Sequence, residues 1–230
     1  GTVFVSVIDP GVGTDRKACV AKTKNGYYIV TPDNGTLTHV LRMDGIEAVR
    51  QIDETSNRLP SSGESYTFHG RDVYAFTGAR LAAGVIGFSG VGPEIPAESV
   101  KELPMVEAYI ADDTVSGTID VLDVRFGSLW TNIPRTLFLK TGIQYGDRVS
   151  ITIENDTRCV YRNIILFGKS FADVYVGEAL AYVNSLDCVA VAINQGSFAR
   201  AYNVGTGNSW RIRIEPFKGF FQCIFGVCLK

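Results

Sequence analysis

Three polar clusters in the first half of the chain carry residue types that take part in acid–base chemistry. They are Asp9-Pro10-Gly11-Val12-Gly13-Thr14-Asp15-Arg16, Thr31-Pro32-Asp33-Asn34-Gly35 and Thr67-Phe68-His69-Gly70-Arg71-Asp72. Each follows a segment expected to be a strand, and ligand crevices in open α/β sheets lie at the carboxyl ends of strands. We therefore expect Asp9, Asp33-Asn34 and His69 to share one crevice. A carboxylate and an imidazole placed there could orient a water molecule and accept its proton.

Simpler structural roles stay open for each cluster. A loop that doubles back from Asp9 would bring Arg16 against it, and such an ion pair could equally serve only to hold a tight loop. Pro32-Asp33-Asn34-Gly35 has the composition of an ordinary type I turn. His69 precedes a glycine and is expected on a loop, whereas His39 falls within a helical pattern and is interpreted as a surface or packing residue.

A fourth cluster, Asp123-Val124-Arg125-Phe126-Gly127-Ser128-Leu129-Trp130-Thr131-Asn132, lies in the second half of the chain. It combines a carboxylate, aromatic rings and small polar groups around a glycine at an expected strand end. Such a set could bind a flat polar ligand, with the carboxylate on an amine and the rings on a base or a cation. Taken singly, Phe126 and Trp130 are more typical of core residues.

Composition restricts the function classes. With 46% apolar and 20% charged residues, the 230-residue chain has the composition of a globular protein, and its net charge of -2 argues against nucleic-acid binding. No apolar run reaches the ~18–20 residues that span a bilayer, so we expect no membrane partner. The five cysteines are scattered and only two histidines occur, so we expect no metal site, reduced thiols and a cytoplasmic protein.

The order of the expected elements divides the chain in two. In the first part, strand patterns at 3–8, 18–23, 27–31 and 46–52 alternate with helical patterns at 36–43 and 72–84, which is typical of an α/β sheet. From residue 106 onward, period-2 alternation with frequent turn residues indicates an antiparallel barrel or sandwich. We therefore predict an α/β domain over 1–96, a linker over 97–105 and an all-β domain over 106–230.

A fifth motif, Asn194-Gln195-Gly196-Ser197, follows the four clusters. In order and approximate spacing, these five motifs resemble the motifs of the S-adenosyl-L-methionine hydroxide adenosyltransferases, which are relatives of the fluorinating and chlorinating enzymes. Each motif is weak alone, whereas five in order over nearly the whole chain are specific. The resemblance implies hydrolysis of S-adenosyl-L-methionine to adenosine and L-methionine, by attack of an activated water or hydroxide on C5′. It implies no cofactor, since the sulfonium of the substrate already makes methionine a good leaving group.

The resemblance also implies an architecture. It consists of a Rossmann-like layered sheet followed by a β-barrel, assembled as a homotrimer with active sites between one subunit's N-terminal domain and its neighbour's C-terminal domain. The family has an N-terminal segment with a Thr-Asp-Phe-Gly motif whose aspartate holds the ribose hydroxyls. Gly1 corresponds to a point well inside the family's first domain, so we expect that part of the site to be missing from this chain.

Residue roles follow where positions match the family's motifs. Asp9, Arg16 and His69 correspond to its catalytic Asp–Arg–His set. The halogenating branch has an aromatic residue in place of this aspartate, so the resemblance to the family favours water over halide as the nucleophile. The implied substrate contacts comprise a carboxylate for the methionine ammonium, aromatic residues around adenine and further polar groups. They are Asp33, Asn34, Asp123, Phe126, Ser128, Trp130, Phe171 and Ser185. Ser128 stands where the family commonly has asparagine.

Two other functions stay open at this point. One is non-catalytic binding of S-adenosyl-L-methionine or adenosine, with the Asp–Arg–His set serving as structure, and the other is halogenation, which Asp9 disfavours. The aromatic stretch 217–230 is interpreted as a buried terminal strand or a subunit contact rather than a membrane contact, because it is short and lacks a basic cluster.

Overall fold

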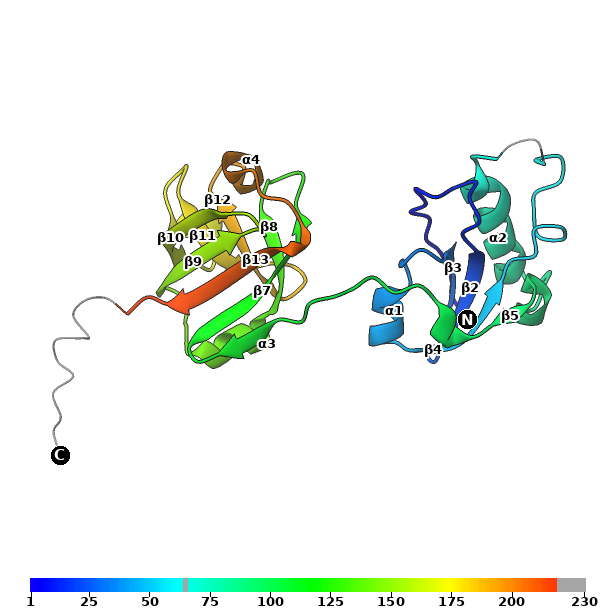
Figure 1. Ribbon diagram of the computed structural model, residues 1–230, viewed down its shortest axis with the longest axis horizontal. Helices are drawn as coiled ribbons and strands as arrows, with labels where there is room; N and C mark the ends of the chain where they lie inside the picture. Colours follow the sequence, from blue (N-terminus) through cyan, green and yellow to red (C-terminus); the bar gives the residue numbers. More distant parts are fainter. Residues whose placement is uncertain (64–65, 219–230) are drawn as a thin grey trace, which may run out of the picture. The chain divides into compact units, whose positions relative to one another are not determined.

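Two units follow one another along the chain in the computed structural model, which describes residues 1–63 and 66–218 (Figure 1). Unit 1 is Gly1–Leu103, and unit 2 begins at Pro104. The boundary falls inside the segment 97–105 that the sequence suggests as a linker. Most of the aromatic stretch 217–230 lies outside the described residues, so its expected role stays a prediction.

Unit 1 is built on a five-stranded sheet in the order β1-β3-β2-β4-β5. In chain order the strands are β1 Val3–Val5, β2 Ala18–Thr23, β3 Tyr28–Pro32, β4 Ile46–Gln51 and β5 Glu94–Ile95. β1 and β3 run parallel, whereas the other pairings in the sheet are antiparallel. Because β1 and β3 point the same way, the segments that follow them leave the sheet at the same edge.

Strand β2 shows why both faces of this sheet are covered. Its side chains alternate between two apolar clusters, since Ala18 and Val20 belong to one and Cys19 and Ala21 to the other. The first cluster includes residues of a π-helical turn, Gly70–Ala75, that continues into α2, Phe76–Ala82. The second includes residues of α1, Thr38–Met43, and Figure 1 shows α1 and α2 on either side of the strands. Short 3-10 turns cover Phe88–Val91 and Ala97–Ser99.

Unit 2 is a closed barrel of seven strands. The ring order is β13-β9-β10-β11-β12-β8-β7, and pairing of β13 with β7 closes it, while β6 adds to β7. The strands are β6 Tyr109–Ala111, β7 Thr114–Leu122, β8 Leu129–Pro134, β9 Arg148–Glu154, β10 Cys159–Phe167, β11 Ala179–Val183, β12 Cys188–Ile193 and β13 Gly207–Pro216. Helices α3, Arg135–Phe138, and α4, Phe198–Tyr202, and 3-10 turns at Leu139–Thr141 and Phe171–Asp173 connect them.

Alternate residues of the barrel strands fill its interior. On β9, Val149, Ile151 and Ile153 are fully buried, and on β13 Ile212 and Ile214 meet them from the neighbouring strand. The residues between them face outward and are mostly polar, which is the period-2 pattern visible in the sequence. No helix in the described part of the chain is long and apolar enough to cross a membrane.

The predicted fold class, an α/β domain followed by a β-barrel, is confirmed, and one local prediction is wrong. His69, expected on a loop, begins the helical segment, because Asp72 does not cap the helix and instead binds Arg71 through its carboxylate. The cluster 123–132 follows the end of β7, as expected, and its second part enters strand β8, where Leu129 and Ile133 are buried in the barrel. His39 lies on α1 and is exposed, in agreement with the sequence interpretation.

Close packing of α2 on β1 yields a stability prediction. A Cβ atom at Gly78 would lie 2.6 Å from Cγ2 of Val5 and 3.5 Å from Cγ2 of Val30. We expect Gly78→Val to lower the free energy of unfolding by about 1–3 kcal/mol, because overpacking forces side chains and backbone apart. Ala79→Val, on the exposed face of the same helix, is the matched control. Urea denaturation compares the two variants, and equal stabilities would contradict this packing.

Candidate active site

The loop after β1 returns on itself and brings Arg16 against Asp9. The amide of Val12 donates to the carbonyl of Asp9 at 3.2 Å, and a second turn follows at once. Gly13 has a φ of +80°, a left-handed conformation that glycine adopts without strain. The guanidinium of Arg16 then meets the carboxylate side-on, with Nε donating to Oδ1 at 2.9 Å and Nη2 to Oδ2 at 2.5 Å.

This ion pair is almost inaccessible to water. The side chain of Arg16 is 6% exposed and that of Asp9 is 5% exposed. Burial opposes the charge of Arg16, but its hydrogen bond to Asp9 and the nearby negative groups outweigh burial and raise the pKa of Arg16. Removing either partner would leave an uncompensated buried charge, so the pair constrains the loop strongly.

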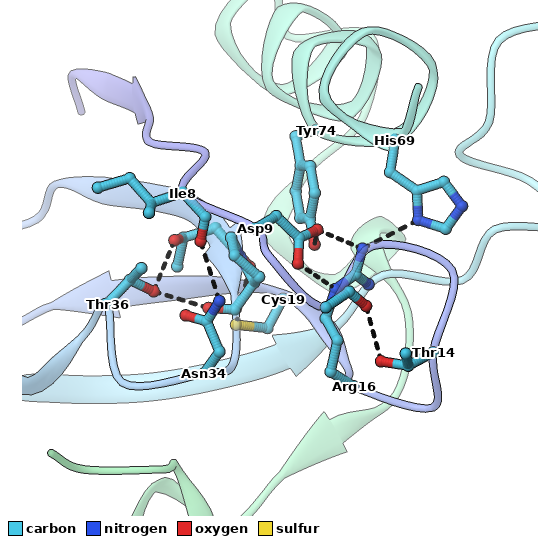
Figure 2. Close-up of polar contacts among 12 residues, drawn as sticks. Ile8, Asp9, Thr14, Arg16, Cys19, Asn34, Thr36, His69 and Tyr74 are labelled. Atoms are coloured by element: carbon cyan, nitrogen blue, oxygen red, sulfur yellow. Dashed lines mark hydrogen bonds and ion pairs between the residues drawn. The ribbon is translucent and has the colours of Figure 1, made fainter. Parts of the chain in front are cut away.

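His69 joins the pair from the start of the helical segment, as Figure 2 shows. Its Nδ1 lies 3.0 Å from Nη2 of Arg16. Guanidinium nitrogens only donate, so Nδ1 must accept, and the neutral ring carries its proton on Nε2. His69 is 7% exposed, and burial lowers its pKa, helped by the positive charges of Arg16 and Arg58 against the opposing effect of Glu54 and Asp9. His69 is therefore a neutral donor through Nε2–H near pH 7.

The structure adds Tyr74, which the sequence interpretation does not include. Tyr74 is fully buried, and its hydroxyl donates to Oδ2 of Asp9 at 3.4 Å. The guanidinium carbon of Arg16 lies 5.5 Å from the centre of the Tyr74 ring, in a cation–π contact. In sequence, Tyr74 is one aromatic residue in a helical pattern, and no local signal distinguishes it from an ordinary core residue.

The second cluster lies beside the first, at the edge where β1 and β3 both end. The side-chain amide of Asn34 donates to the carbonyl of Ile8 at 2.9 Å, directly before Asp9. The carboxylate of Asp33 accepts from the amide of Lys101 at 2.8 Å. Oδ1 of Asn34 is buried without a hydrogen-bond partner in the described part of the chain. The structure therefore gives Asp33 and Asn34 positioning contacts, and Asn34 keeps one acceptor unused.

Unit 2 holds a pocket of about 560 Å³ where three loops meet. Phe126, Phe171 and the turn Asn194–Ser197 line it, together with Arg125 and Arg200. Gly127 has a φ of +68° and lies so close to Ser197 that a Cβ atom would not fit. This contact joins the turn after β7 to the turn after β12, so the two aromatic residues border one cavity. Flat apolar walls with polar groups at the margin suit a planar heteroaromatic ring.

The other predicted contacts in unit 2 lie outside the lining of this pocket. The carboxylate of Asp123 accepts from the amides of Arg125 and Phe126 in its own turn. Ser128, directly before β8, is buried, and Trp130 on β8 is half-buried. The Oγ atom of Ser128 and the Nε1 atom of Trp130 have no hydrogen-bond partner among the described residues. Ser185 lies exposed in the turn between β11 and β12.

Metal ligands and reactive thiols are the remaining classes of chemistry to consider. Within residues 1–63 and 66–218, no three His, Cys, Asp or Glu side chains gather as a metal site. Burial raises the pKa of the Cys19 thiol to about 12, and this thiol donates to the carbonyl of Thr31. Cys19 is therefore a protonated core residue rather than a nucleophile.

Two family models match the chain. The model described as SAM hydroxide adenosyltransferase N-terminal domain matches residues 1–92, and the one for the C-terminal domain of the same family matches residues 117–211. The two matches include the Asp9–Arg16–His69 cluster and most of the pocket of unit 2, respectively.

Several curated proteins are similar to this chain. An (R)-S-adenosyl-L-methionine hydrolase of Thermus thermophilus is 32% identical, over 92% of this chain and 76% of the relative. One of the same name from Methanocaldococcus jannaschii is 38% identical over 67% of this chain, and the chain spans only 50% of that relative. A fluorinase of Actinopolyspora mzabensis is 28% identical, over 92% of this chain and 77% of its own.

The fold also recurs in a solved structure. The crystal structure of a conserved protein from Thermotoga maritima superposes with a TM-score of 0.78 at 35% identity. The match covers 93% of this chain and 76% of that one. The similarity in sequence and the similarity in structure therefore extend over both units.

The state of His69 predicts a pH dependence of stability. Because its folded pKa lies below the unfolded value of about 6.5, the unfolded chain binds more protons, and stability falls as pH drops through that value. We expect His69→Gln to lose less stability between pH 7.5 and pH 5.5 than the wild type, measured by urea denaturation at each pH. His39→Gln, which replaces the other histidine of the chain at an exposed position, is the control. A wild-type profile that matches the His69→Gln profile would argue that His69 is not held neutral.

Proposed function

This chain belongs to the S-adenosyl-L-methionine hydroxide adenosyltransferase family, and on that premise we propose that it hydrolyses S-adenosyl-L-methionine to adenosine and L-methionine. The observation that carries the proposal is the buried Asp9–Arg16–His69 cluster, in a chain whose relatives include proteins named (R)-S-adenosyl-L-methionine hydrolase. In the reaction a C5′–O bond forms while the C5′–S bond breaks. The electron pair of that bond passes to sulfur, which leaves as the neutral thioether of methionine.

The nucleophile is the difficult part of this reaction, because water is a weak nucleophile whereas the sulfonium leaves readily. Asp9 is the proposed proton acceptor. Its Oδ1 receives one hydrogen bond, from Arg16, within the described part of the chain, and a carboxylate oxygen has room for a second. A water molecule bound there would lose its proton to Asp9 as its oxygen attacks C5′.

His69 has a different role in this proposal. Its Nδ1 lone pair is occupied by Arg16, so the ring serves as a donor and not as a base. Nε2–H would bind the oxygen of the nucleophile and turn one of its lone pairs toward C5′. Positioning of this kind supplies a large share of the rate when the reacting atoms lie in line.

We propose that the pocket of unit 2 binds the adenine ring. Phe126 and Phe171 provide two aromatic walls, and stacking of a base on an aromatic side chain contributes about 1–3 kcal/mol. The unpartnered groups of Ser128 and Trp130 remain available for further substrate contacts, and Asp123 and Ser185 stay candidates for the two ends of methionine. Asp33 and Asn34 are proposed to act on the nucleophile side of the substrate.

We further propose a homotrimer in which the cluster of one copy works with the aromatic pocket of a neighbour. Unit 1 supplies charged groups and unit 2 supplies apolar surface, so each site needs both. No cofactor is proposed, because the substrate carries its own activated leaving group. Within the described residues, Cys19, Cys159 and Cys188 form no disulfide, which supports the proposed cytoplasmic location.

Halogenation and binding without turnover are the competing functions. A halide nucleophile needs no base, and the positive charge of Arg16 that could attract an anion is already paired with Asp9, so the cluster favours water. Incubation with S-adenosyl-L-methionine and separation of the products by chromatography decides among the three. Adenosine supports hydrolysis, a chloride-dependent 5′-chloro product supports halogenation, and bound but unchanged substrate supports a binding protein.

Replacing the acceptor or the donor tests the proposed chemistry. We expect Asp9→Asn and His69→Ala to lower kcat by about 10²–10⁴-fold while KM changes by no more than a few-fold, because each removes a contact to the nucleophile rather than to the substrate. Glu94→Gln, in an exposed ion pair with Arg50, is the control and should leave kcat unchanged. Equal losses in kcat and in substrate affinity would point to a binding role instead.

Mixing two inactive variants tests the shared site. His69→Ala disables unit 1, and Phe126→Asp places a charge in the pocket of unit 2, at a residue exposed enough to tolerate it. If each site joins two copies, co-refolding equal amounts should restore about a quarter of wild-type activity, because that fraction of random neighbours supplies both intact halves. Light scattering should give the mass of three 25.0 kDa chains. A monomeric mass, or a mixture with no restored activity, would refute the shared site.

A further inference from the structure

Tyr74 touches both members of the buried ion pair, and neither the sequence motifs nor the proposed chemistry assigns it a role. Its hydroxyl lies on Oδ2 of Asp9, and its ring lies against the guanidinium of Arg16. We propose that Tyr74 is a positioning residue that fixes the Asp9–Arg16 pair in the orientation in which Arg16 donates to Nδ1 of His69. The kinetic consequence rests on the proposed function, whereas the structural consequence at His69 does not.

The hydrogen bonds of the cluster explain why one more contact matters. Nη2 of Arg16 serves both Oδ2 of Asp9 and Nδ1 of His69, so its two hydrogens are both committed. Rotation of the Asp9 carboxylate would draw Nη2 away from the imidazole. The contacts from Arg16 come from the same loop as Asp9 and would move with it. Within the described part of the chain, Tyr74 is the side chain that contacts the carboxylate of Asp9 from a different element, the helical segment.

Tyr74 is itself rigidly held. It is fully buried in the cluster that includes Val20, Val30 and Leu81, between the sheet and α2. Burial raises the pKa of Tyr74 well above its usual range, so the hydroxyl stays protonated and can only donate to the carboxylate. A packed side chain that donates from a fixed place restricts the rotation of its acceptor.

The ring makes a second, independent contribution. A guanidinium over an aromatic face is attracted by the ring, and the attraction is stronger where water is excluded, as it is here. The fully buried ring thereby supports Arg16 within the interior of unit 1. A phenylalanine would fill the same core volume and keep this contact, so the hydroxyl is the part of Tyr74 that separates positioning from packing.

Nitrogen-15 NMR of the histidine side chains reads the proposed effect directly. Only His39 and His69 are present in the chain, so the exposed His39 serves as an internal reference. In the wild type we expect His69 as a single neutral form with the proton on Nε2. In Tyr74→Phe we expect a mixture with the Nδ1–H form, because Arg16 no longer holds Nδ1 permanently. Tyr161→Phe, which removes a buried hydroxyl from unit 2, should leave both histidine spectra unchanged.

Kinetics supply the second readout. We expect Tyr74→Phe to lower kcat by about tenfold with KM nearly unchanged, since loss of a hydrogen bond to a charged group loosens the nucleophile and not the substrate. Tyr74→Phe should keep a single cooperative thermal transition, because phenylalanine fills the same core volume. If the wild type forms no adenosine but the His69 spectrum changes in Tyr74→Phe, the positioning role stands and the proposed function fails.

A double variant tests whether the effect of Tyr74→Phe on His69 passes through Asp9. Asp9→Asn keeps the shape of the carboxylate and should produce the same mixture of His69 forms. If Tyr74 acts through Asp9, adding Tyr74→Phe to Asp9→Asn changes the His69 spectrum no further. A His69 spectrum unaltered by Tyr74→Phe, or a double variant whose effects simply add, overturns the proposal.

Discussion

Arg16 bonds two partners with one nitrogen, because its Nη2 donates both to Oδ2 of Asp9 and to Nδ1 of His69. This arrangement fixes three properties of the site together. It neutralises a carboxylate that is buried almost completely, it holds the imidazole in one neutral form, and it ties a loop after β1 to a helix that starts more than fifty residues later in the chain. Everything else in unit 1 can be understood as the support that keeps this one guanidinium in place.

The fold provides that support from three directions. The parallel pairing of β1 and β3 places the segments after both strands at one edge, where Asn34 holds the carbonyl before Asp9. The double turn at 9–14 reverses the chain so that Arg16 meets the carboxylate of its own loop. The helical segment packs so closely on β1 that only a glycine fits at position 78, and this depth brings His69 and Tyr74 within reach of the pair. A site of this kind therefore depends on backbone packing as much as on the identity of its polar residues.

Sequence reasoning reaches part of this arrangement and stops at identifiable points. The Asp9–Arg16 contact follows from a loop whose proline and glycines force a reversal, and the strand and helix patterns give the fold class. The start of the helix is missed because Asp72 looks like a capping residue, although its carboxylate is bound by Arg71. The protonation state of His69 depends on a partner distant in sequence, and no local pattern encodes it. Tyr74 is missed for the same reason, since a buried tyrosine in a helical pattern differs from a core residue only through contacts with a distant loop. The aromatic pocket is predictable in part. Its residues stand out in the sequence, but that they border one cavity depends on the close approach of Gly127 to Ser197, which the sequence does not show.

The near-zero net charge of the cluster has a consequence for the proposed reaction. The substrate carries a positive sulfonium, and as the C5′–S bond breaks this charge passes to the oxygen of the attacking water and then, with a proton, to Asp9. A carboxylate without a counter-ion would also attract the sulfonium itself, and stabilisation of the bound substrate does not speed the chemical step. Arg16 compensates the charge of Asp9 and His69 stays neutral, so the cluster attracts the sulfonium little, while an oxygen of Asp9 can still accept the proton that water loses in the transition state. The same compensation leaves little reason for an anionic nucleophile to enter, because the positive charge that would attract it is already satisfied. On this argument the ion pair does more than close a loop, since its neutrality is what suits the site to water attacking a cation.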